Sequence, residues 1–545
     1  MNRRQFLSYS ALAAGTATAA WWQLRRSNYP PSVSVRRIGL PLAHALRDAQ
    51  LPLTHSREQS CDTLILGSGA AALSAAWWLV RNGQRNILLA EGFERNGNQA
   101  AYTFGESKSS LHAPTGAHYL PQPSAESIHV RQMLHDLGII QGSNPLTHPI
   151  YSDMDLVHQP DERVWADGAW HSGLLPRQDA DTQRFFQYIA TLRHAKDVSG
   201  NKAFAMPVAL SSAAEEWRRL DRITFAQWLK QQGYQSPVLW WYLDYCCRDD
   251  YGQGVAQVSA FAGLHYFAAR GNENAAVLTW ADGLNHIAEK LRQFIGLQEL
   301  ADFPDTAEYA LRQPASVPAV ALSVEEQDDA VNVHLRHTQN GKTHLIRAKN
   351  VICAMPLAVA KRVLRHAERY GFTAQNPLPQ SAPWLVGNFV LRRFPNEAAH
   401  TELAWDNIRY GSPALGYVVA SHQAIRVAKP EQTIFTAYRA LNHAPPDQVR
   451  RQLLHAADED LLALAAEDLL AVYGKAFWRA VVHVDIAVRA HAMAVPAVGY
   501  LSNPLLLQLR GHHSRLQFAH SDLSSYSVFE EAVHWGVQAA QRLLG

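Results

Sequence analysis

Cysteine, concentrated charge and long apolar runs are all scarce in this 545-residue chain. Its four cysteines, two of them adjacent at Cys246 and Cys247, are too few for a disulfide framework. They show no CxxC spacing either, so no metal site is expected. The formal net charge is only +2, and acids and bases are mixed along the chain. A nucleic-acid-binding protein needs a concentrated basic face, so no nucleic acid partner is expected.

Apolar residues are present in the amount typical of a globular protein with large cores. Hydrophobic residues make up 47% of the chain and charged residues 18%. The chain is longer than a single hydrophobic core normally serves, so length and composition predict two domains.

The N-terminus has the pattern of an export signal. Arg3 and Arg4 resemble the twin-arginine motif, and an uncharged, alanine-rich stretch with small residues at Ala17 and Ala19 follows. The stretch is shorter than the ~20 apolar residues of a membrane span. We therefore expect residues 1–25 to be a signal read by the twin-arginine translocase, which carries folded proteins, and the protein to be periplasmic. A retained anchor, which would leave it membrane-associated, is the alternative.

A βαβ unit is predicted after a linker. Residues 26–57 hold several prolines and no sustained periodicity, which predicts a linker on the surface. An apolar run at 63–66, a glycine turn, an alanine-rich segment at 70–80 and a second apolar run at 86–90 then predict strand, turn, helix and strand.

The turn of this unit carries a G-x-G-x-x-A version of the dinucleotide-binding fingerprint. Gly67 permits the tight turn, Gly69 lets the backbone approach a pyrophosphate, and the small Ala72 lets the helix pack closely on the strand. The helix N-terminus faces the anion. Glu91, at the end of the second strand, can accept hydrogen bonds from ribose hydroxyls. The expected dinucleotide contacts are Gly67, Ser68, Gly69, Ala71, Ala72 and Glu91.

The rest of the chain divides into helical and strand-rich parts. Long segments with one polar face predict mostly helix over 127–300. A β-hairpin is predicted over 331–346, around Asn340-Gly341, and it leads into a strand at 351–354. Further strands are predicted at 382–394 and 432–438, and helix at 446–473.

Four separate segments resemble the flavin amine oxidase and phytoene desaturase group. Glu91 is followed by a glycine-rich loop that includes Gly97. Residues 280–284 resemble the family's turn into a helix, and the strand at 351–354 resembles its return into the cofactor domain. At the C-terminus a strand, a turn with Asp522 and a helix follow one another. These matches occur in the family's order along the chain.

The resemblance implies FAD as cofactor and an α/β fold. The expected architecture is a Rossmann-like FAD-binding domain with a parallel sheet, similar to that of glutathione reductase, plus an inserted α+β substrate domain. The FAD-binding domain is expected over 58–125, 276–362 and 484–545, and the substrate domain over 126–275 and 363–483. No cysteine follows Cys353, so the cysteinyl flavin linkage of some relatives cannot form and the FAD is expected to be noncovalent.

The resemblance also implies further cofactor contacts. Asp522 is expected at the ribityl or pyrophosphate region, although a helix cap is the alternative role. The amides that open the last helix near Val528 are expected to face the flavin ring, where negative charge gathers on reduction. Gly97, Gly116 and Ala117 are the remaining expected contacts.

Three residues are candidates for the catalytic site by the same resemblance. Tyr526 lies where relatives place an aromatic wall beside the flavin. Asn388 lies where many relatives have a lysine that reaches the flavin through a water, which puts rapid reaction with oxygen in doubt. His118 follows the segment that passes the flavin ring, and a structural, hydrogen-bonded histidine is its alternative role.

The substrate is a small organic molecule under every enzymatic interpretation. Carboxylates and aromatic residues alternate over 242–251, which suits a cationic amine, although an Arg-Asp-Asp run also occurs as a solvated helix end. We expect an exported FAD-dependent oxidoreductase that oxidises an amine or polyamine by hydride transfer to flavin. The alternatives are a desaturase or dehydrogenase linked to membrane quinone, and a catalytically inactive flavin-binding protein.

Overall fold

The computed structural model describes residues 31–48, 51–105, 110–270, 276–303, 312–397, 401–423 and 430–545. The predicted signal segment, residues 1–25, lies outside these ranges. In the described part of the chain, no helix is both long and apolar enough to cross a membrane.

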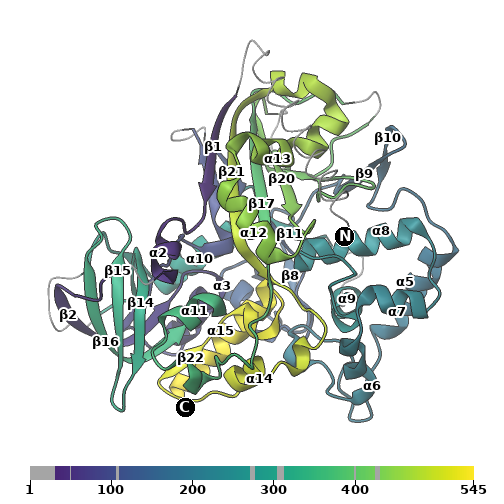
Figure 1. Ribbon diagram of the computed structural model, residues 1–545. Helices are drawn as coiled ribbons and strands as arrows, with labels where there is room; N and C mark the ends of the chain where they lie inside the picture. Colours follow the sequence, from purple (N-terminus) through teal and green to yellow (C-terminus); the bar gives the residue numbers. More distant parts are fainter. Residues whose placement is uncertain are drawn as a thin grey trace.

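An eight-stranded sheet with a parallel centre contains the predicted βαβ unit (Figure 1). Its strands are β12 (Gln298–Glu299), β13 (Ala315–Val317), β3 (Ile87–Ala90), β2 (Arg57–Leu66), β16 (Thr343–Cys353), β15 (Val331–His337) and β14 (Ala319–Glu326), with β22 (Leu516–Phe518) beside β16. β15 and β16 form the predicted hairpin, and Gly341 in its turn has the positive φ, 72°, that favours glycine. Strands β2, β3, β13, β16 and β22 run parallel.

Helices cover both faces of this first sheet. One face packs on α3 (Ala70–Arg81), α4 (Ile128–Asp136), α10 (Asn285–Ile295) and α15 (Phe529–Leu544), and the other on α11 (Leu357–Val363) and α14 (Pro504–Arg510). Leu64 and Ile65, which point to opposite faces of β2, are both fully buried. This is why the strand reads as a continuous apolar run.

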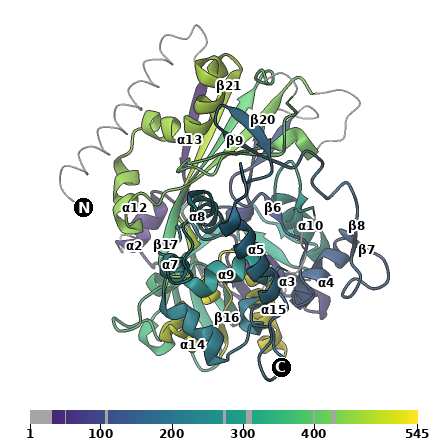
Figure 2. The ribbon, with the colours of Figure 1, turned by 90° about the vertical axis from the view of Figure 1, so that its right-hand side faces the viewer.

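A second eight-stranded sheet lies beside the first. Its strands, in order, are β1 (Ser32–Arg37), β21 (Val481–Ala494), β17 (Ser381–Leu391), β20 (Thr433–Ala440), β19 (Tyr417–Val419), β18 (Asp406–Arg409), β9 (Glu162–Ala166) and β10 (Ala169–Ser172). One face packs on α12 (Pro446–His455) and α13 (Asp458–Tyr473). The other faces α5 (Ala180–Leu192), α7 (Phe225–Gln231), α8 (Pro237–Tyr251) and α9 (Ala260–Ala268), which are turned toward the viewer in Figure 2.

The remaining elements are short. They are the helices α2 (Leu42–Arg47) and α6 (Glu215–Arg218) and three two-stranded ribbons: β4 (Ala101–Phe104) with β5 (Leu111–Pro114), β6 (Tyr119–Leu120) with β11 (Leu278–Thr279), and β7 (Ile140–Gln141) with β8 (Ile150–Tyr151).

Two sequence-based expectations about segments need correction. Residues 26–57 were expected to be a linker, but β1 lies in this range and pairs in parallel with β21 over Ser32–Arg37. The expected cofactor segment from 484 begins inside β21, which belongs to the second sheet. In both cases long-range pairing, which leaves no local signal, decides where the segment lies.

Candidate cofactor and substrate site

A cavity of about 1020 Å³ runs between the two sheets. Its size is at the upper end of the range for small-molecule and cofactor sites, roughly 300–1000 Å³. It is lined by segments from both ends of the chain, including Gly67–Ala71 and Asp522. A dinucleotide therefore has room to lie along it.

The N-terminus of α3 opens into this cavity. Gly67 has φ 121°, and a Cβ built there would lie 2.8 Å from the carbonyl oxygen of Ala354, so the turn requires glycine. Gly69 is the N-cap of α3, and no side chain caps the helix. The first amides of α3 are thus left to a ligand, and they carry the positive end of the helix dipole. This arrangement fits a pyrophosphate.

Glu91 lines the cavity at the end of β3, and an arginine from a neighbouring helix fixes its carboxylate. The Arg292 guanidinium donates to its Oε1 at 2.9 Å. Ser68 ties the glycine turn to the loop that follows Glu91, since its hydroxyl donates to the Glu91 carbonyl at 2.7 Å and accepts from the Asn96 amide at 3.1 Å. The sequence pattern did not reveal this contact of Arg292, because the residue comes from α10.

The C-terminal segment closes the opposite side. Asp522 lines the cavity and accepts a hydrogen bond from the Leu357 amide at 2.9 Å, at the start of α11. Burial opposes its charge, but His520 and the Leu357 amide outweigh burial and lower its pKa. Asp522 thus lines the cavity and binds the start of α11, not the segment beside Ser524 and Ser525, and its contact with the cofactor stays a prediction.

The last helix presents a second uncapped N-terminus to the cavity. Val528, Phe529 and Ala532 line it, and no side chain caps α15. This end of the helix suits negative charge, such as a reduced flavin develops.

The other expected cofactor contacts divide into lining and packing residues. Gly97 and Ala117 line the cavity, whereas Ala72 and Gly116 are not among the residues that line it. Ala72 is fully buried in the core between α3 and the first sheet. Gly116 lies against the backbone of Asn98, where a Cβ would approach the carbonyl oxygen to 2.2 Å.

An aromatic and acidic chamber adjoins the cavity where Ala117 is followed by His118 and Tyr119. We define the chamber by three carboxyl groups and the rings beside them. The carboxyl groups are Glu162, Asp249 and Asp406, and the rings are His118, Tyr119, Tyr242, Tyr245, Trp405 and Tyr438. His118 stacks on Tyr438 with ring centroids 4.4 Å apart. Tyr438 in turn donates at 3.1 Å to the carbonyl of Gly116, the residue before Ala117, which lines the cavity.

The three carboxyl groups come from three separate elements. Asp249 lies on α8, whose start is fixed by the Ser236 cap and Pro237 and whose end is fixed by Gly252 in the left-handed conformation. Glu162 and Asp406 are direct neighbours in the parallel pairing of β9 with β18. Like charges placed side by side on neighbouring strands destabilise a sheet. The pair therefore lowers the stability of the fold when both groups are charged, as is common for residues of a functional site.

The pKa values of the chamber carboxyls are raised. Burial, followed by the charges of Asp161 and Asp249, raises the pKa of Glu162 to about 7. Burial, followed by Asp250, raises that of Asp249 to about 7, and burial together with Glu162 and Asp249 raises that of Asp406. The side chains keep some accessible surface.

No basic residue in the described ranges forms an ion pair with these three carboxyl groups. The Tyr119 hydroxyl donates to Asp249 at 3.2 Å. Arg270, which is near, pairs with Asp250 instead. Negative charge in the chamber is thus left for a ligand to balance.

His118 adjoins the cavity in this chamber, and burial lowers its pKa to about 3, so its ring is neutral. Its part in catalysis stays a prediction. Neutral imidazole stacked between rings can shape the chamber and exclude water, but it supplies no positive charge.

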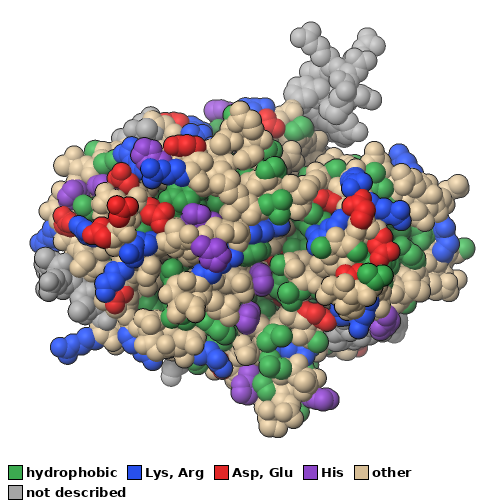
Figure 3. Space-filling model, turned by 90° about the horizontal axis from the view of Figure 1, so that it is seen from below, with side chains coloured by type: hydrophobic (Ala, Val, Ile, Leu, Met, Phe, Trp, Pro, Cys, Tyr) green, Lys and Arg blue, Asp and Glu red, His purple; other side chains and the backbone are tan. Residues whose placement is uncertain are grey.

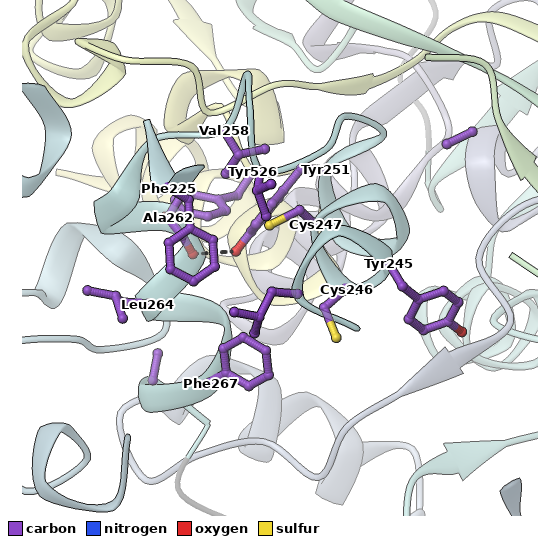
Figure 4. Close-up of a cluster of buried hydrophobic side chains, with 14 of the residues drawn as sticks. Phe225, Tyr245, Cys246, Cys247, Tyr251, Val258, Ala262, Leu264, Phe267 and Tyr526 are labelled. Carbon is purple, nitrogen blue, oxygen red and sulfur yellow. Dashed lines mark hydrogen bonds between the residues drawn. The ribbon is translucent and has the colours of Figure 1, made fainter. Parts of the chain in front are cut away.

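Tyr526 does not form the expected wall beside the flavin. It is fully buried in the core beneath α8 and α9, with its ring 5.3 Å from that of Tyr251, and Figure 4 shows it among apolar side chains of this core. Its hydroxyl is 2.6 Å from the Tyr500 hydroxyl. The residue belongs to the core because its segment folds inward before α15 begins.

Asn388 does not reach the cavity either. It is fully buried in β17 and is not among the lining residues. Its amide donates to the Pro114 carbonyl at 3.1 Å and accepts from the Thr436 hydroxyl at 2.7 Å. Both ends of the side chain are satisfied, so it ties β17 to its neighbours and is not a counterpart of the flavin-facing lysine.

The fold and the cavity agree with the comparisons with known proteins. A family model described as flavin containing amine oxidoreductase matches residues 71–544. The chain belongs to this family.

Solved structures show the same fold at low sequence identity. Wild-type putrescine oxidase bound to putrescine aligns with a TM-score of 0.59 at 14% identity, covering 89% of this chain and 99% of the other. Cyclohexylamine oxidase from Brevibacterium oxydans IH-35A aligns at 0.58 and 14%, covering 88% and 98%. A fatty acid isomerase from P. acnes that produces CLA aligns at 0.58 and 15%, covering 89% and 99%. None of the curated proteins compared matches this chain.

This family member is an FAD-dependent oxidoreductase. The uncapped starts of α3 and α15, Glu91 and the cavity volume fit FAD, which supplies a hydride acceptor when bound. The chain's own residues would hold the dinucleotide and order its surroundings. Glu531 of α15 is fully buried outside the cavity lining, and its carboxyl group accepts from the Val208 amide and the Ser524 hydroxyl, each at 2.5 Å.

Proposed function

We propose that the chamber binds a small cationic amine, preferably a diamine or polyamine, which is oxidised at a carbon next to nitrogen by hydride transfer to FAD. The observation that carries this proposal is the set of three carboxyl groups, Glu162, Asp249 and Asp406, which lie beside the cofactor cavity among aromatic rings and form no ion pair with any described residue.

The residues of the chamber account for a preference for cationic amines over anionic substrates. A carboxylate in a poorly hydrated space attracts an ammonium group strongly, and aromatic faces such as those of Tyr119 and Trp405 add cation–π attraction. The raised pKa values mean that an entering cation favours loss of a proton from the cluster, so binding and ionisation support each other. A fatty acid carboxylate, by contrast, would be repelled by the same groups.

The test is anaerobic reduction of the flavin followed by its visible spectrum near ~450 nm. We expect diamines and polyamines to bleach the bound flavin, simple monoamines to do so at higher concentration, and fatty acids to leave it oxidised. Reduction by none of the amines, with FAD fully bound, would overturn the proposed substrate class and favour an inactive flavin-binding protein. Reoxidation of the reduced protein by oxygen or by a soluble quinone would then identify the electron acceptor.

We also propose that the protein is exported through the twin-arginine translocase to the periplasm. The support is the Arg3-Arg4 pair and the segment after it. Fractionation of cells that express the full chain tests this, with a variant carrying lysine at both arginines as control. Equal periplasmic amounts of the two would overturn it.

A further inference from the structure

The first described residues, 31–48, lie outside the region that matches the family, which starts at residue 71. We call residues 31–48 the N-terminal strap. Its first part, β1, adds an edge strand to the second sheet through parallel pairing with β21. Arg36 holds it there by two hydrogen bonds to the Asp485 carboxylate, at 2.9 and 2.7 Å.

The second part of the strap forms one wall of the cofactor cavity. After β1 the chain turns at Gly39, whose φ is 86°, and continues into α2. A Cβ at Gly39 would contact the Phe93 ring at 3.6 Å, and Phe93 lies in the loop that follows Glu91. The residues that line the cavity here include Arg37, Gly39, Leu40, Ala43, His44 and Arg47.

The strap therefore bridges the two sheets across the cavity. At one end β1 belongs to the second sheet, and at the other Leu46 packs against the core of the first sheet. In Figure 1 the helix α2 lies between β1 and the strands of the first sheet. A ligand in the cavity beside Glu91 and Phe93 is covered by the strap from outside.

The charge around this end of the cavity suits an anionic ligand. Besides Arg37 and Arg47, the lining includes Lys361 and Arg362 of α11 and Arg450 of α12. Asp48 pairs with Arg47 at 2.7 Å and Asp458 pairs with Arg37 at 3.1 Å, so the charges of both strap arginines are balanced. The surplus positive charge lies on α11 and α12, and such a rim attracts the phosphates of a dinucleotide. On the face in Figure 3, by contrast, basic and acidic side chains are interspersed.

We propose that the N-terminal strap is a clasp for FAD, supplied from outside the residues that the family model matches, which covers the cofactor at the Glu91 end and slows its release. A noncovalent cofactor leaves by opening of the segments that cover it, so a clasp anchored to both sheets lengthens its residence. The inference rests on FAD binding alone, and failure of the amine proposal would leave it intact.

Two substitutions in α2 provide the test. Ala43 lines the cavity, whereas Ala45, two residues farther along the same helix, does not. Ala43→Glu places a carboxylate against the bound dinucleotide, and Ala45→Glu is the matched control. We expect FAD release, followed by the rise in flavin fluorescence after dilution, to be at least about tenfold faster in Ala43→Glu and within about twofold of the parent in Ala45→Glu. Equal release rates in parent and both variants would overturn the proposal.

Limited proteolysis of the unaltered chain keeps the proposal testable if Ala43→Glu fails to fold. Trypsin cleavage after Arg37 or Arg47, mapped by mass spectrometry, is compared in the FAD-loaded and FAD-free protein. Cleavage after Arg222, whose side chain is 69% exposed, is the internal reference. We expect FAD to slow cleavage of the strap at least about tenfold relative to Arg222. Equal ratios with and without FAD would show that the strap does not clasp the cofactor.

Discussion

Replacing Glu162 by glutamine should change how the stability of this protein depends on pH. Burial, with Asp161 and Asp249, raises the pKa of Glu162 from 4.5 to about 7 in the folded protein. Between these two values the unfolded chain has lost the proton that the folded protein keeps. Stability is therefore lost as the pH rises through this window, and the loss is complete above about pH 7.

The magnitude follows from the width of the window. At about 1.4 kcal/mol for each pKa unit, ionised Glu162 costs the fold up to about 3.5 kcal/mol at pH 8, and solvent screening of this half-buried side chain reduces the cost to roughly 1–3 kcal/mol. Glu162→Gln removes the ionisation and keeps the shape. At pH 4.5 we expect the free energy of unfolding of the variant to equal that of the parent or to lie slightly below it. At pH 8 it should exceed that of the parent by roughly 1–3 kcal/mol.

Thermal unfolding at a series of pH values measures this difference. At this chain length about 1 kcal/mol corresponds to about 1 °C in Tm, so the variant should gain roughly 1–3 °C on the parent between pH 4.5 and 8. Glu58→Gln, an exposed position on β2, is the control and should follow the parent. Parallel Tm curves for Glu162→Gln and the parent, or a variant that is less stable at pH 8, would refute the reasoning.

Three further changes test the site. Asp249→Asn removes a carboxylate from the chamber, and we expect the Kd of a diamine at pH 8, measured by anaerobic stopped-flow, to rise about tenfold while the limiting rate of flavin reduction stays within about threefold; an unchanged Kd would contradict the proposed ammonium site. Gly67→Ala forces a Cβ toward the Ala354 carbonyl, 2.8 Å away, so the ratio of flavin to protein absorbance should fall severalfold, and full FAD content would argue against the pyrophosphate turn. Tyr526→Phe removes only the hydrogen bond with Tyr500 and should cost about 1 kcal/mol in unfolding while reduction rates stay within about twofold; a tenfold slower reduction would restore the catalytic role expected from sequence.

Short, local sequence patterns were sufficient to predict much of the cofactor domain. The glycine turn at Gly67 and Gly69, the alanine-rich helix and Glu91 lie within one βαβ unit, where each residue's role follows from its own spacing. The hairpin at Asn340-Gly341 is local in the same way, and it forms as the sequence predicts. These features are short-range, so the order of residues is enough to place them.

Family position was a weaker guide to individual side chains. Tyr526 and Asn388 lie in the segments that the resemblance assigned, but both are fully buried in cores and away from the cavity. In a strand one residue of difference turns a side chain to the other face, and in an irregular segment the direction depends on what packs around it. A motif match fixes the segment and leaves the direction open.

The sequence by itself therefore determined the family, the cofactor and the glycine turn, because each depends on residues that are neighbours along the chain or on motifs in a fixed order. Tertiary structure alone decided the substrate chamber and the strap. Glu162 and Asp406 meet only because β9 pairs with β18 across more than two hundred residues, and Asp249 joins them from α8. β1 reaches the cofactor cavity only because it pairs with β21 at the far end of the chain. Pairing of distant strands depends on the packing of the whole molecule, and for that reason it leaves no signal in any short stretch of sequence.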